Sequence, residues 1–208
     1  MFTGLIREIG IVKNRHNNVL TIQSGIKPKK GDSIALNGVC LTVVDLYDGG
    51  FMLELGNETR KLIPPEKFQG KVHLEPAMIM GDRFEGHIVQ GHIDTIGTIK
   101  NIDAKENTVD MCISVDASVM PVIIHKGSIA IDGISLTINS TGKDWFKLSI
   151  IPHTLKNTLL GELKTGDKVN IETDLFARYI DRILRKRFGN TSETLLSWSA
   201  VDAINMSF

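Results

Sequence analysis

Cysteine is scarce in this chain of 208 residues, and its scarcity excludes several classes of protein. The two cysteines, Cys40 and Cys112, lie far apart, and neither belongs to a CxxC pair. A disulfide-rich secreted domain and a cysteine-rich zinc site are therefore excluded, and free thiols in a reducing compartment are expected. The amino-terminal segment also lacks the basic stretch and apolar run of a signal peptide. We expect a cytoplasmic protein.

The chain has neither an excess of charge nor an apolar run long enough for a membrane span. Its 24 lysines and arginines balance its 24 aspartates and glutamates, so no net field attracts nucleic acid or an acidic membrane. Glycine-rich phosphate loops, GxSxG elbows, HExxH motifs and nucleotide fingerprints are missing as well. These absences argue against nucleic-acid and membrane partners, nucleoside triphosphates, nicotinamide cofactors and hydrolase triads.

What the chain does contain is an internal repeat. The segment Ser33–Val43 returns as Ser128–Ile138, with six of eleven positions identical and all but one of the others exchanged for residues of similar shape. The exception is Cys40, which aligns with Ser135. Further matches extend the repeat to about ninety residues, which is too long for a solenoid and indicates two tandem domains. The predicted divisions are 1–87, 88–174 and 175–208.

Each copy consists of short segments rich in Val, Ile, Leu and Thr, separated by Gly, Asp, Asn or Pro, which is a strand-and-turn pattern. About six such strands hide both edges of their sheet only by closing it or nearly closing it. The predicted fold class is all-β, with two tandem homologous six-stranded Greek-key barrels followed by a carboxy-terminal α-helix. The strands predicted for the first copy are 4–13, 19–23, 33–36, 40–47, 51–55 and 71–75. Those predicted for the second copy are 91–101, 109–115, 128–131, 135–139, 146–151 and 168–172.

The carboxy-terminal helix is predicted to begin after Asp174, a suitable N-cap residue. Its apolar residues recur at helical spacing, opposite a side that is rich in arginine. They are Leu175, Phe176, Tyr179, Ile180, Ile183 and Leu184. Beyond the helix the apolar character continues at Leu195, Leu196, Trp198, Val201 and Ile204. Docking onto the chain's own barrels and pairing with other subunits both fit this pattern.

Two histidines lie in the junction between the copies, Gly86–Asp94. In extended structure His92 and Asp94 point to one face, so that the carboxylate could orient or charge the imidazole. His87 and His92 would face opposite ways, which disfavours a metal site. A turn rich in small residues with a hydrogen-bonded surface histidine is the alternative explanation.

Cys40 begins a strand directly after a tight turn, where a side chain can reach the mouth of a barrel. A lone cysteine among Val and Leu is more often a small buried hydrophobic residue, but Ser135 indicates that the equivalent position accepts a hydroxyl group. Thr42 and Thr137 lie two residues further along on the same face and extend a polar lining.

Three further features carry polar groups. Lys126 and Asp132 form either a charge pair near a pocket or two solvated turn residues. The segment 150–155 ends a strand at Pro152 and presents polar side chains at a rim, where the first copy has 56–59. Binding loops and ordinary β-connections both fit these two segments.

These motifs together resemble one family. The opening MFTGLI, the pair NGVCLT and DGISLT, the junction GHIVQGHID and the segment IPHTL resemble the riboflavin synthases of the duplicated, lumazine-binding type. The resemblance spans the chain from Met1 to the helix near Leu184. It implies a dismutation without cofactor or metal, in which two molecules of 6,7-dimethyl-8-ribityllumazine exchange a four-carbon unit. The products are riboflavin and 5-amino-6-(D-ribitylamino)uracil, and tandem barrels supply the two similar pockets that this reaction needs.

The resemblance also implies an assembly. In the family the protein is a homotrimer, and each active site forms between the first barrel of one subunit and the second barrel of its neighbour. The apolar helix would then be the trimer contact. Association with lumazine synthase, the preceding enzyme of the pathway, is a possible further partnership that the sequence leaves open.

Carried over motif by motif, the resemblance assigns residues to two pockets. The first-barrel pocket comprises Gly4, Leu5, Ile6, Cys40, Leu41, Thr42, Glu54, Leu55, Gly56, Asn57, Glu58 and Thr59. The second-barrel pocket comprises Gly91, His92, Ile93, Lys126, Ser135, Leu136, Thr137, Ile151, Pro152, His153, Thr154, Leu155 and Lys156. Cys40 or a water molecule near it is predicted as the nucleophile, and His92 as the group that transfers a proton. Polar support is assigned to Ser135, Asp132, Lys126 and Asp174.

Two other classes of function compete with this interpretation. A non-catalytic relative that holds lumazine or flavin as an optical antenna would keep the barrels, but such relatives typically depart from the GHID and PHT segments, which are intact here. A structural or interaction module built on duplicated barrels would bind no small ligand at all.

Overall fold

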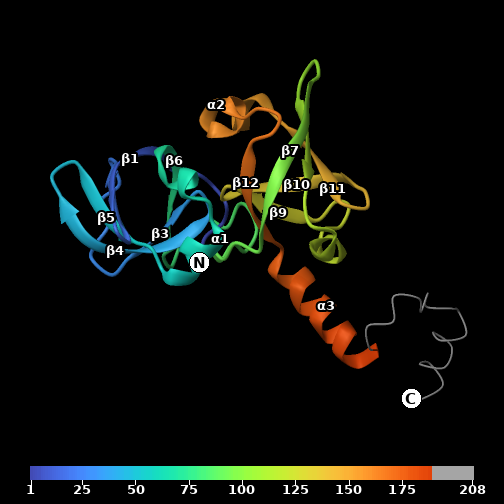
Figure 1. Cartoon of the computed structure of the whole chain (residues 1–208), viewed down its shortest axis with the longest axis horizontal. Coiled ribbons are helices and arrows are strands. Elements are labelled where there is room, and N and C mark those ends of the chain that lie inside the picture. Colours follow the sequence, from blue (N-terminus) through green and yellow to red (C-terminus); the bar gives the residue numbers. More distant parts are fainter. Residues whose placement is uncertain (189–208) are drawn as a thin grey trace, which may run out of the picture.

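The computed structural model describes residues 1–188, which form two closed six-stranded antiparallel barrels side by side, followed by a long helix (Figure 1). The first barrel has the strand order β1-β2-β5-β4-β3-β6, and the second β10-β11-β8-β7-β12-β9. The two orders are the same ring once six is subtracted from each strand number of the second. The prediction of two tandem Greek-key barrels with a carboxy-terminal helix is confirmed.

The elements have the following bounds. The first barrel contains β1 (Glu8–His16), β2 (Val19–Gln23), β3 (Ser33–Leu36), β4 (Val39–Tyr47), β5 (Gly50–Glu54) and β6 (Gly70–Pro76). The second contains β7 (Thr95–Ala104), β8 (Val109–Ser114), β9 (Ser128–Ile131), β10 (Ile134–Thr141), β11 (Trp145–Ile150) and β12 (Lys168–Thr173). The helical elements are α1 (Asn57–Leu62), η1 (Pro65–Phe68), η2 (Ala117–Val122), α2 (Pro152–Asn157), η3 (Leu159–Glu162) and α3 (Leu175–Phe188).

Two predicted strands begin too early. Residues 4–7 and 91–94 are not strands, because Gly4 and Gly91 have φ angles of +80° and +81°, which turn the chain out of its own sheet. We call residues 2–6 the first leader and residues 89–93 the second leader.

Side chains of β4 and β10 alternate between the inside and the outside of each barrel. Val39, Leu41 and Val43 are buried in the first core, whereas Cys40 is half-buried and Thr42 is exposed. The second copy follows the same alternation. Cys40 therefore points away from the packed interior, as predicted, and lies on the outer face, where another segment can cover it.

The two barrels are related by a local two-fold axis. The repeat aligns Phe2 with Val89, since 2 + 87 = 89, and these two residues pair with each other in an antiparallel bridge. The N–H of Phe2 donates to the carbonyl oxygen of Val89 at 2.7 Å, and the N–H of Val89 donates back at 3.1 Å. Together with Ala35 and Ala130 they form a small apolar core. Equivalent residues in reciprocal contact are the mark of two-fold symmetry.

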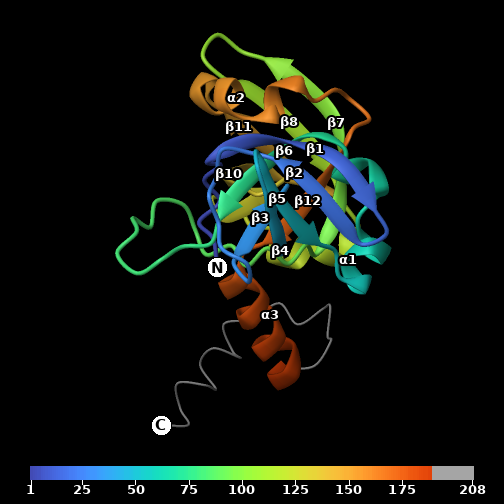
Figure 2. The same ribbon diagram turned by 90° about the vertical axis from the view of Figure 1, so that its left-hand side faces the viewer.

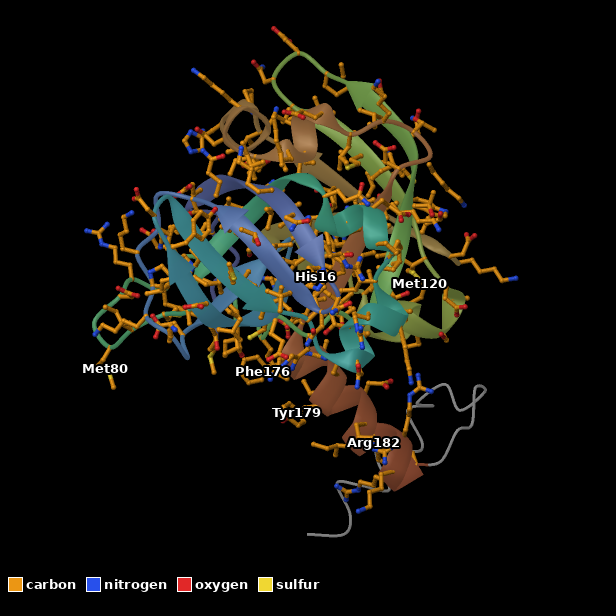
Figure 3. All side chains as sticks on the ribbon, turned by 60° about the vertical axis from the view of Figure 1, so that its left-hand side comes forward. His16, Met80, Met120, Phe176, Tyr179 and Arg182 are labelled. Atoms are coloured by element: carbon orange, nitrogen blue, oxygen red, sulfur yellow. The ribbon has the colours of Figure 1, made fainter. Side chains whose placement is uncertain are left out.

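Helix α3 begins at the predicted position and leaves the barrels (Figures 1 and 2). The carboxylate oxygen Oδ1 of Asp174 accepts hydrogen bonds from the N–H groups of Phe176 and Ala177, which confirms the N-cap. The apolar side of the helix is exposed, including Phe176 and Tyr179 in Figure 3. The apolar residues Leu195, Leu196, Trp198, Val201 and Ile204 lie outside the described residues. Within residues 1–188, no helix combines the length and apolarity needed to span a bilayer.

Candidate functional site

Each leader packs against the barrel of the other copy. The N–H of Cys40 donates to the carbonyl oxygen of Gly91 at 2.9 Å, and Ile93 packs against the core of the first barrel. In the same way the N–H of Ser135 donates to the carbonyl oxygen of Gly4 at 2.8 Å, and Ile6 packs against the core of the second barrel. The predicted pockets had these leaders the other way round. Each leader thus lies beside strand β4 or β10 of the other copy.

Glycine is required in both leaders because each leader lies very close to the barrel of the other copy. A Cβ atom on Gly91 would lie 2.5 Å from Cβ of Cys40, and one on Gly4 would lie 2.7 Å from Cβ of Ser135. Such distances exclude any side chain at either glycine. The local pattern of each leader predicted extended structure, and nothing in that pattern specifies which barrel the segment reaches.

Two buried glutamates hold the leaders. Glu75 accepts hydrogen bonds from the N–H groups of Thr3 and Gly4 at 2.8 and 3.1 Å. Glu172 accepts three, from residues 90, 91 and 92, at 2.7, 2.8 and 3.0 Å. Burial raises the pKa of both carboxyl groups, while the donated hydrogen bonds lower it. Sequence reasoning missed this pair, although a glutamate recurs at the same place in both copies, at the end of an apolar strand.

A cavity of about 460 Å³ lies where the second leader meets the first barrel. It brings together Cys40 and His92, the predicted nucleophile and proton-transfer residue, and also Thr59 from α1. Its other lining residues are Val39, Leu62, Ile63, Gly91 and Ile93. The volume falls within the range of small-molecule sites, about 300–1,000 Å³. Val39, Leu62 and Ile63 were not predicted, because their apolar side chains carry no chemical signature.

The junction between the barrels supplies the hydrogen-bond partner of Ser135. Nδ1 of His87 lies 2.7 Å from Oγ of Ser135. The imidazole is buried, and within residues 1–188 its Nε2 atom has no hydrogen-bond partner. Burial lowers the pKa of His87, and the charge of Asp174 opposes this shift, so the imidazole is neutral at pH 7. The sequence contained both residues, but their 48-residue separation gave no sign of the contact.

Asp132 and Lys126 do not form a charge pair, and of the two only Lys126 is a solvated turn residue. Asp132 is buried between the barrels, where its Oδ2 atom lies 2.8 Å from Nζ of Lys67. Lys126 is an exposed turn residue with a φ angle of +62°. Asp132 lines a separate cavity of about 410 Å³ together with Asn37 and His73. Neither Asp132 nor Lys126 lines the cavity that contains Cys40.

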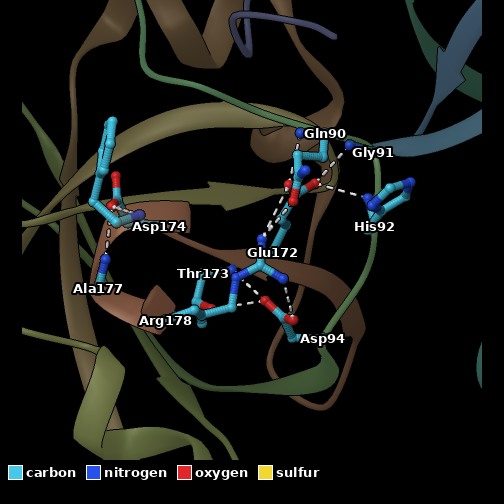
Figure 4. A network of polar contacts seen from close by, with 10 residues as sticks. Gln90, Gly91, His92, Asp94, Glu172, Thr173, Asp174, Ala177 and Arg178 are labelled. Carbon is cyan, nitrogen blue, oxygen red and sulfur yellow. Dashed lines mark hydrogen bonds and ion pairs between the residues drawn. The ribbon is translucent and has the colours of Figure 1, made fainter. Parts of the chain in front are cut away.

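Asp94 does not orient His92 either. Its Oδ2 atom accepts hydrogen bonds from the N–H and the hydroxyl group of Thr173, and its Oδ1 atom pairs with Arg178 at 2.8 Å (Figure 4). Both carboxylate oxygens are thereby engaged. The strand geometry behind the predicted pairing fails because residues 91–94 are not a strand.

The remaining predicted residues fall into three groups. Leu41 and Leu55 are buried in the first core, and Leu136 and Leu155 pack against the second. Exposed positions are those of Thr42, Glu54, Gly56, Asn57, Thr137, Ile151, Pro152, His153 and Lys156. Leu5 and Thr154 are half-buried. Asn57 and Glu58 begin α1, and 152–156 belong to α2, so both predicted loop segments contain short helices.

Comparison with known proteins agrees with this architecture. The lumazine binding domain family matches residues 3–77 and again residues 90–174. The riboflavin synthase of Actinobacillus pleuropneumoniae is 41% identical over 206 residues, which are 95% of this chain and 96% of that protein. The riboflavin synthase of Bacillus subtilis is 37% identical over the same shares of the two chains. The chain belongs to the riboflavin synthase family.

Solved structures show the same fold at lower identity than the family's synthases. LumP in complex with 6,7-dimethyl-8-(1'-D-ribityl) lumazine superposes with a TM-score of 0.69, and LumP in complex with riboflavin with 0.72. Both are 24% identical and cover 83% of this riboflavin synthase family member and 99% of the LumP chain.

Proposed function

We propose that this protein is a riboflavin synthase that converts two molecules of 6,7-dimethyl-8-ribityllumazine into riboflavin and 5-amino-6-(D-ribitylamino)uracil. The observation that carries the proposal is the cavity in which Cys40 of the first copy meets His92 of the second. Identity of 41% to a riboflavin synthase over 95% of the chain supports it. A reaction between two identical molecules needs two similar sites, and the duplicated barrels supply them.

The proposed chemistry divides between the two copies. One lumazine loses a proton from its acidic C7 methyl group, and a nucleophile adds to the ring of the other. Cys40, or a water molecule beside it, is the nucleophile, and His92, which lines the same cavity, transfers the proton. Ser135 donates or accepts a hydrogen bond in the second pocket. Holding the two rings in register can contribute as much as any single side chain, since proximity and orientation can supply roughly 7–11 kcal/mol.

We further propose that the protein acts as a homotrimer, in which the first barrel of one subunit, with the cavity of Cys40 and His92, faces the second barrel of the next, so that each active site lies between two subunits. The exposed apolar side of α3 supports this, because a face that its own barrels leave uncovered needs another subunit. Domain limits of 1–87 and 88–174 remain our proposal. Both cysteines are free, which fits a reducing compartment such as the cytoplasm. Association with lumazine synthase rests on the family resemblance alone.

The test is turnover of purified protein at saturating lumazine, followed by riboflavin fluorescence. Cys40→Ser and His92→Gln should each lower turnover, by up to about 100-fold, the lower end of what a general acid–base group contributes. Matched controls are Cys112→Ser and His16→Gln, which change the same residue types away from the cavity. If Cys40→Ser and His92→Gln both retain full turnover, these roles are wrong.

The same assay separates the competing functions. An antenna protein would bind the lumazine without producing riboflavin, and a structural module would bind no lumazine at high micromolar concentration. The intact GHID and PHT segments, and identity of 41% to a synthase against 24% to LumP, favour the enzyme.

A further inference from the structure

Arg178 reaches back from α3 to the second leader. Its Nη1 atom lies 2.8 Å from Oδ1 of Asp94, and its Nη2 atom donates to Oε1 of Gln90 at 3.0 Å (Figure 4). The same Nη2 atom lies 3.8 Å from Oε1 of Glu172. The side chain of Arg178 is 27% exposed, whereas the next arginine of the helix, Arg182, is exposed to solvent.

These contacts involve the residues that flank His92 in the sequence. Gln90 and Asp94 stand two residues before and two residues after it, so one guanidinium group holds both ends of the segment. Glu172 holds the backbone between those ends through its three hydrogen bonds. The planar fork of arginine can bind two acceptors at once, which an ammonium group at one point cannot do.

The first leader has no such tie. Glu75 accepts hydrogen bonds from its backbone, as Glu172 does from the second leader. Within residues 1–188, however, no arginine or lysine lies within ion-pair distance of Glu75. The residue that aligns with Asp94 is itself an arginine, Arg7, since 94 − 87 = 7. The link from α3 therefore reaches only the leader that carries His92.

We propose that Arg178 is a positioning residue that sets the place of His92 in the cavity beside Cys40. It would thereby couple the position of α3 relative to the second leader to catalysis. The inference rests on the proposed role of His92. Losing the guanidinium would release the side chain of Gln90 and the Oδ1 atom of Asp94, while Thr173 keeps its hydrogen bonds to Oδ2 of Asp94 and Glu172 keeps those to the backbone. Displacement of a catalytic group by about 1 Å can cost about 100-fold in rate.

The experiment measures turnover and lumazine affinity for Arg178→Met and Arg178→Lys. The matched control is Arg182→Met, which changes an exposed arginine on the polar side of the same helix. Arg178→Met should lower kcat by tenfold to about 100-fold with a smaller change in KM. Arg178→Lys should recover part of the loss, because it can pair with Asp94 or with Gln90 but not with both. Arg182→Met should behave as wild type. Gln90→Ala removes one of the two hydrogen bonds and serves if Arg178→Met does not fold.

A second set of variants separates positioning from a merely structural role. In a His92→Gln background, Arg178→Met should cause no further loss of kcat, because the group that it positions is already gone. A full additional loss there would overturn the inference while leaving the role of His92 intact. Wild-type kcat for folded Arg178→Met would also overturn it. Wild-type turnover of His92→Gln alone would overturn the proposed role of His92, and this inference with it.

Discussion

At the scale of single residues, the two copies differ in the partner of one side chain. Ser135 has the buried imidazole of His87 at 2.7 Å, whereas within residues 1–188 no group hydrogen-bonds the sulfur of Cys40. A neutral His87 with its proton on Nδ1 donates to Oγ and leaves the Ser135 hydroxyl hydrogen free for a ligand. The other tautomer would bury an unpaired N–H at Nε2. The first tautomer is favoured because orphaned buried N–H groups are rarer than unfilled acceptors.

Replacement of His87 tests this arrangement. His87→Leu removes the hydrogen bond to Ser135 and should lower turnover, whereas His87→Asn, with a polar atom near the place of Nδ1, should retain most of it. In a Ser135→Ala background, His87→Leu should have little further effect, since the hydroxyl that it orients is absent. Steady-state turnover of the four variants measures the coupling. Equal losses from His87→Leu with and without Ser135 would contradict the pairing.

Gly91→Ala tests the close approach of the second leader to the first barrel. The new Cβ atom would lie 2.5 Å from Cβ of Cys40, and a φ angle of +81° costs an alanine roughly 1–2 kcal/mol. We expect a lower thermal midpoint together with loss of turnover by about 100-fold, because Cys40 and His92 are pushed apart. Gly31→Ala is the control, since Gly31 has φ +90° and nothing within 4 Å. It should lose stability but keep turnover, and equal turnover losses in both variants would refute the steric argument.

At the scale of elements, the sequence predicts those strands and helices that are specified by a local pattern of apolar residues and turns. Strands such as 33–36 and 128–131 were predicted with their observed bounds, because alternation and flanking turns specify them locally. The short helices α1 and α2 were missed, since six residues hold too little periodicity to distinguish a helix from a loop. The crossing of the leaders was also missed, because it depends on contacts between residues about ninety positions apart in the chain. That crossing decides which residues share the cavity.

Helix α3 supplies the prediction at this scale. Ile183, with 61% of its surface exposed, lies on the apolar side that we assign to the subunit contact. Ile183→Asp should dissociate the trimer, since burial of an isoleucine contributes about 1.5–3 kcal/mol per copy and a buried unpaired carboxylate costs more. Light scattering gives the mass, and turnover should fall with it because each site needs two subunits in the proposed assembly. Arg182→Ala on the polar side should remain trimeric. If the Ile183→Asp variant has the same oligomeric mass as the wild type, the subunit contact lies elsewhere.

At the scale of the whole molecule, a buried polar network joins the barrels around the local two-fold axis. The side chain of His73 donates to the carbonyl oxygen of Asp132, and its counterpart Asn170 donates to the carbonyl oxygen of Asn37. The two halves differ where His73 also accepts a hydrogen bond on Nε2, from the N–H of Leu159 at 2.7 Å. Because a backbone N–H occupies Nε2, His73 is neutral with its proton on Nδ1. Protonation would break that hydrogen bond and bury a charge between the barrels.

Stability should therefore fall in acid. Burial lowers the pKa of His73 despite the charge of Asp132, so the unfolded chain, with a histidine pKa of about 6.5, takes up the proton first as the pH falls. The free energy of unfolding should be flat for this group above that value and should decrease below it, by up to about 1.4 kcal/mol per pH unit. Lys67 beside Asp132 lowers the pKa of His73 further, and Glu162 opposes this.

The variant that isolates this effect is His73→Asn, which installs the residue of the second copy. Asparagine can still donate to the carbonyl oxygen of Asp132, but it loses the hydrogen bond from the N–H of Leu159, so the free energy of unfolding at pH 7 should be lower by about 1 kcal/mol. Because asparagine does not titrate, the free energy of unfolding of the variant should decline less steeply between about pH 6.5 and 5. Buried His87 acts in the same direction, and Glu75 and Glu172, with raised pKa values, act in the opposite one. All three are common to both proteins and cancel in the difference. Denaturant unfolding at a series of pH values measures that difference, and parallel curves for the two proteins would mean that His73 binds its proton equally well in the folded and unfolded states, so that burial does not lower its pKa.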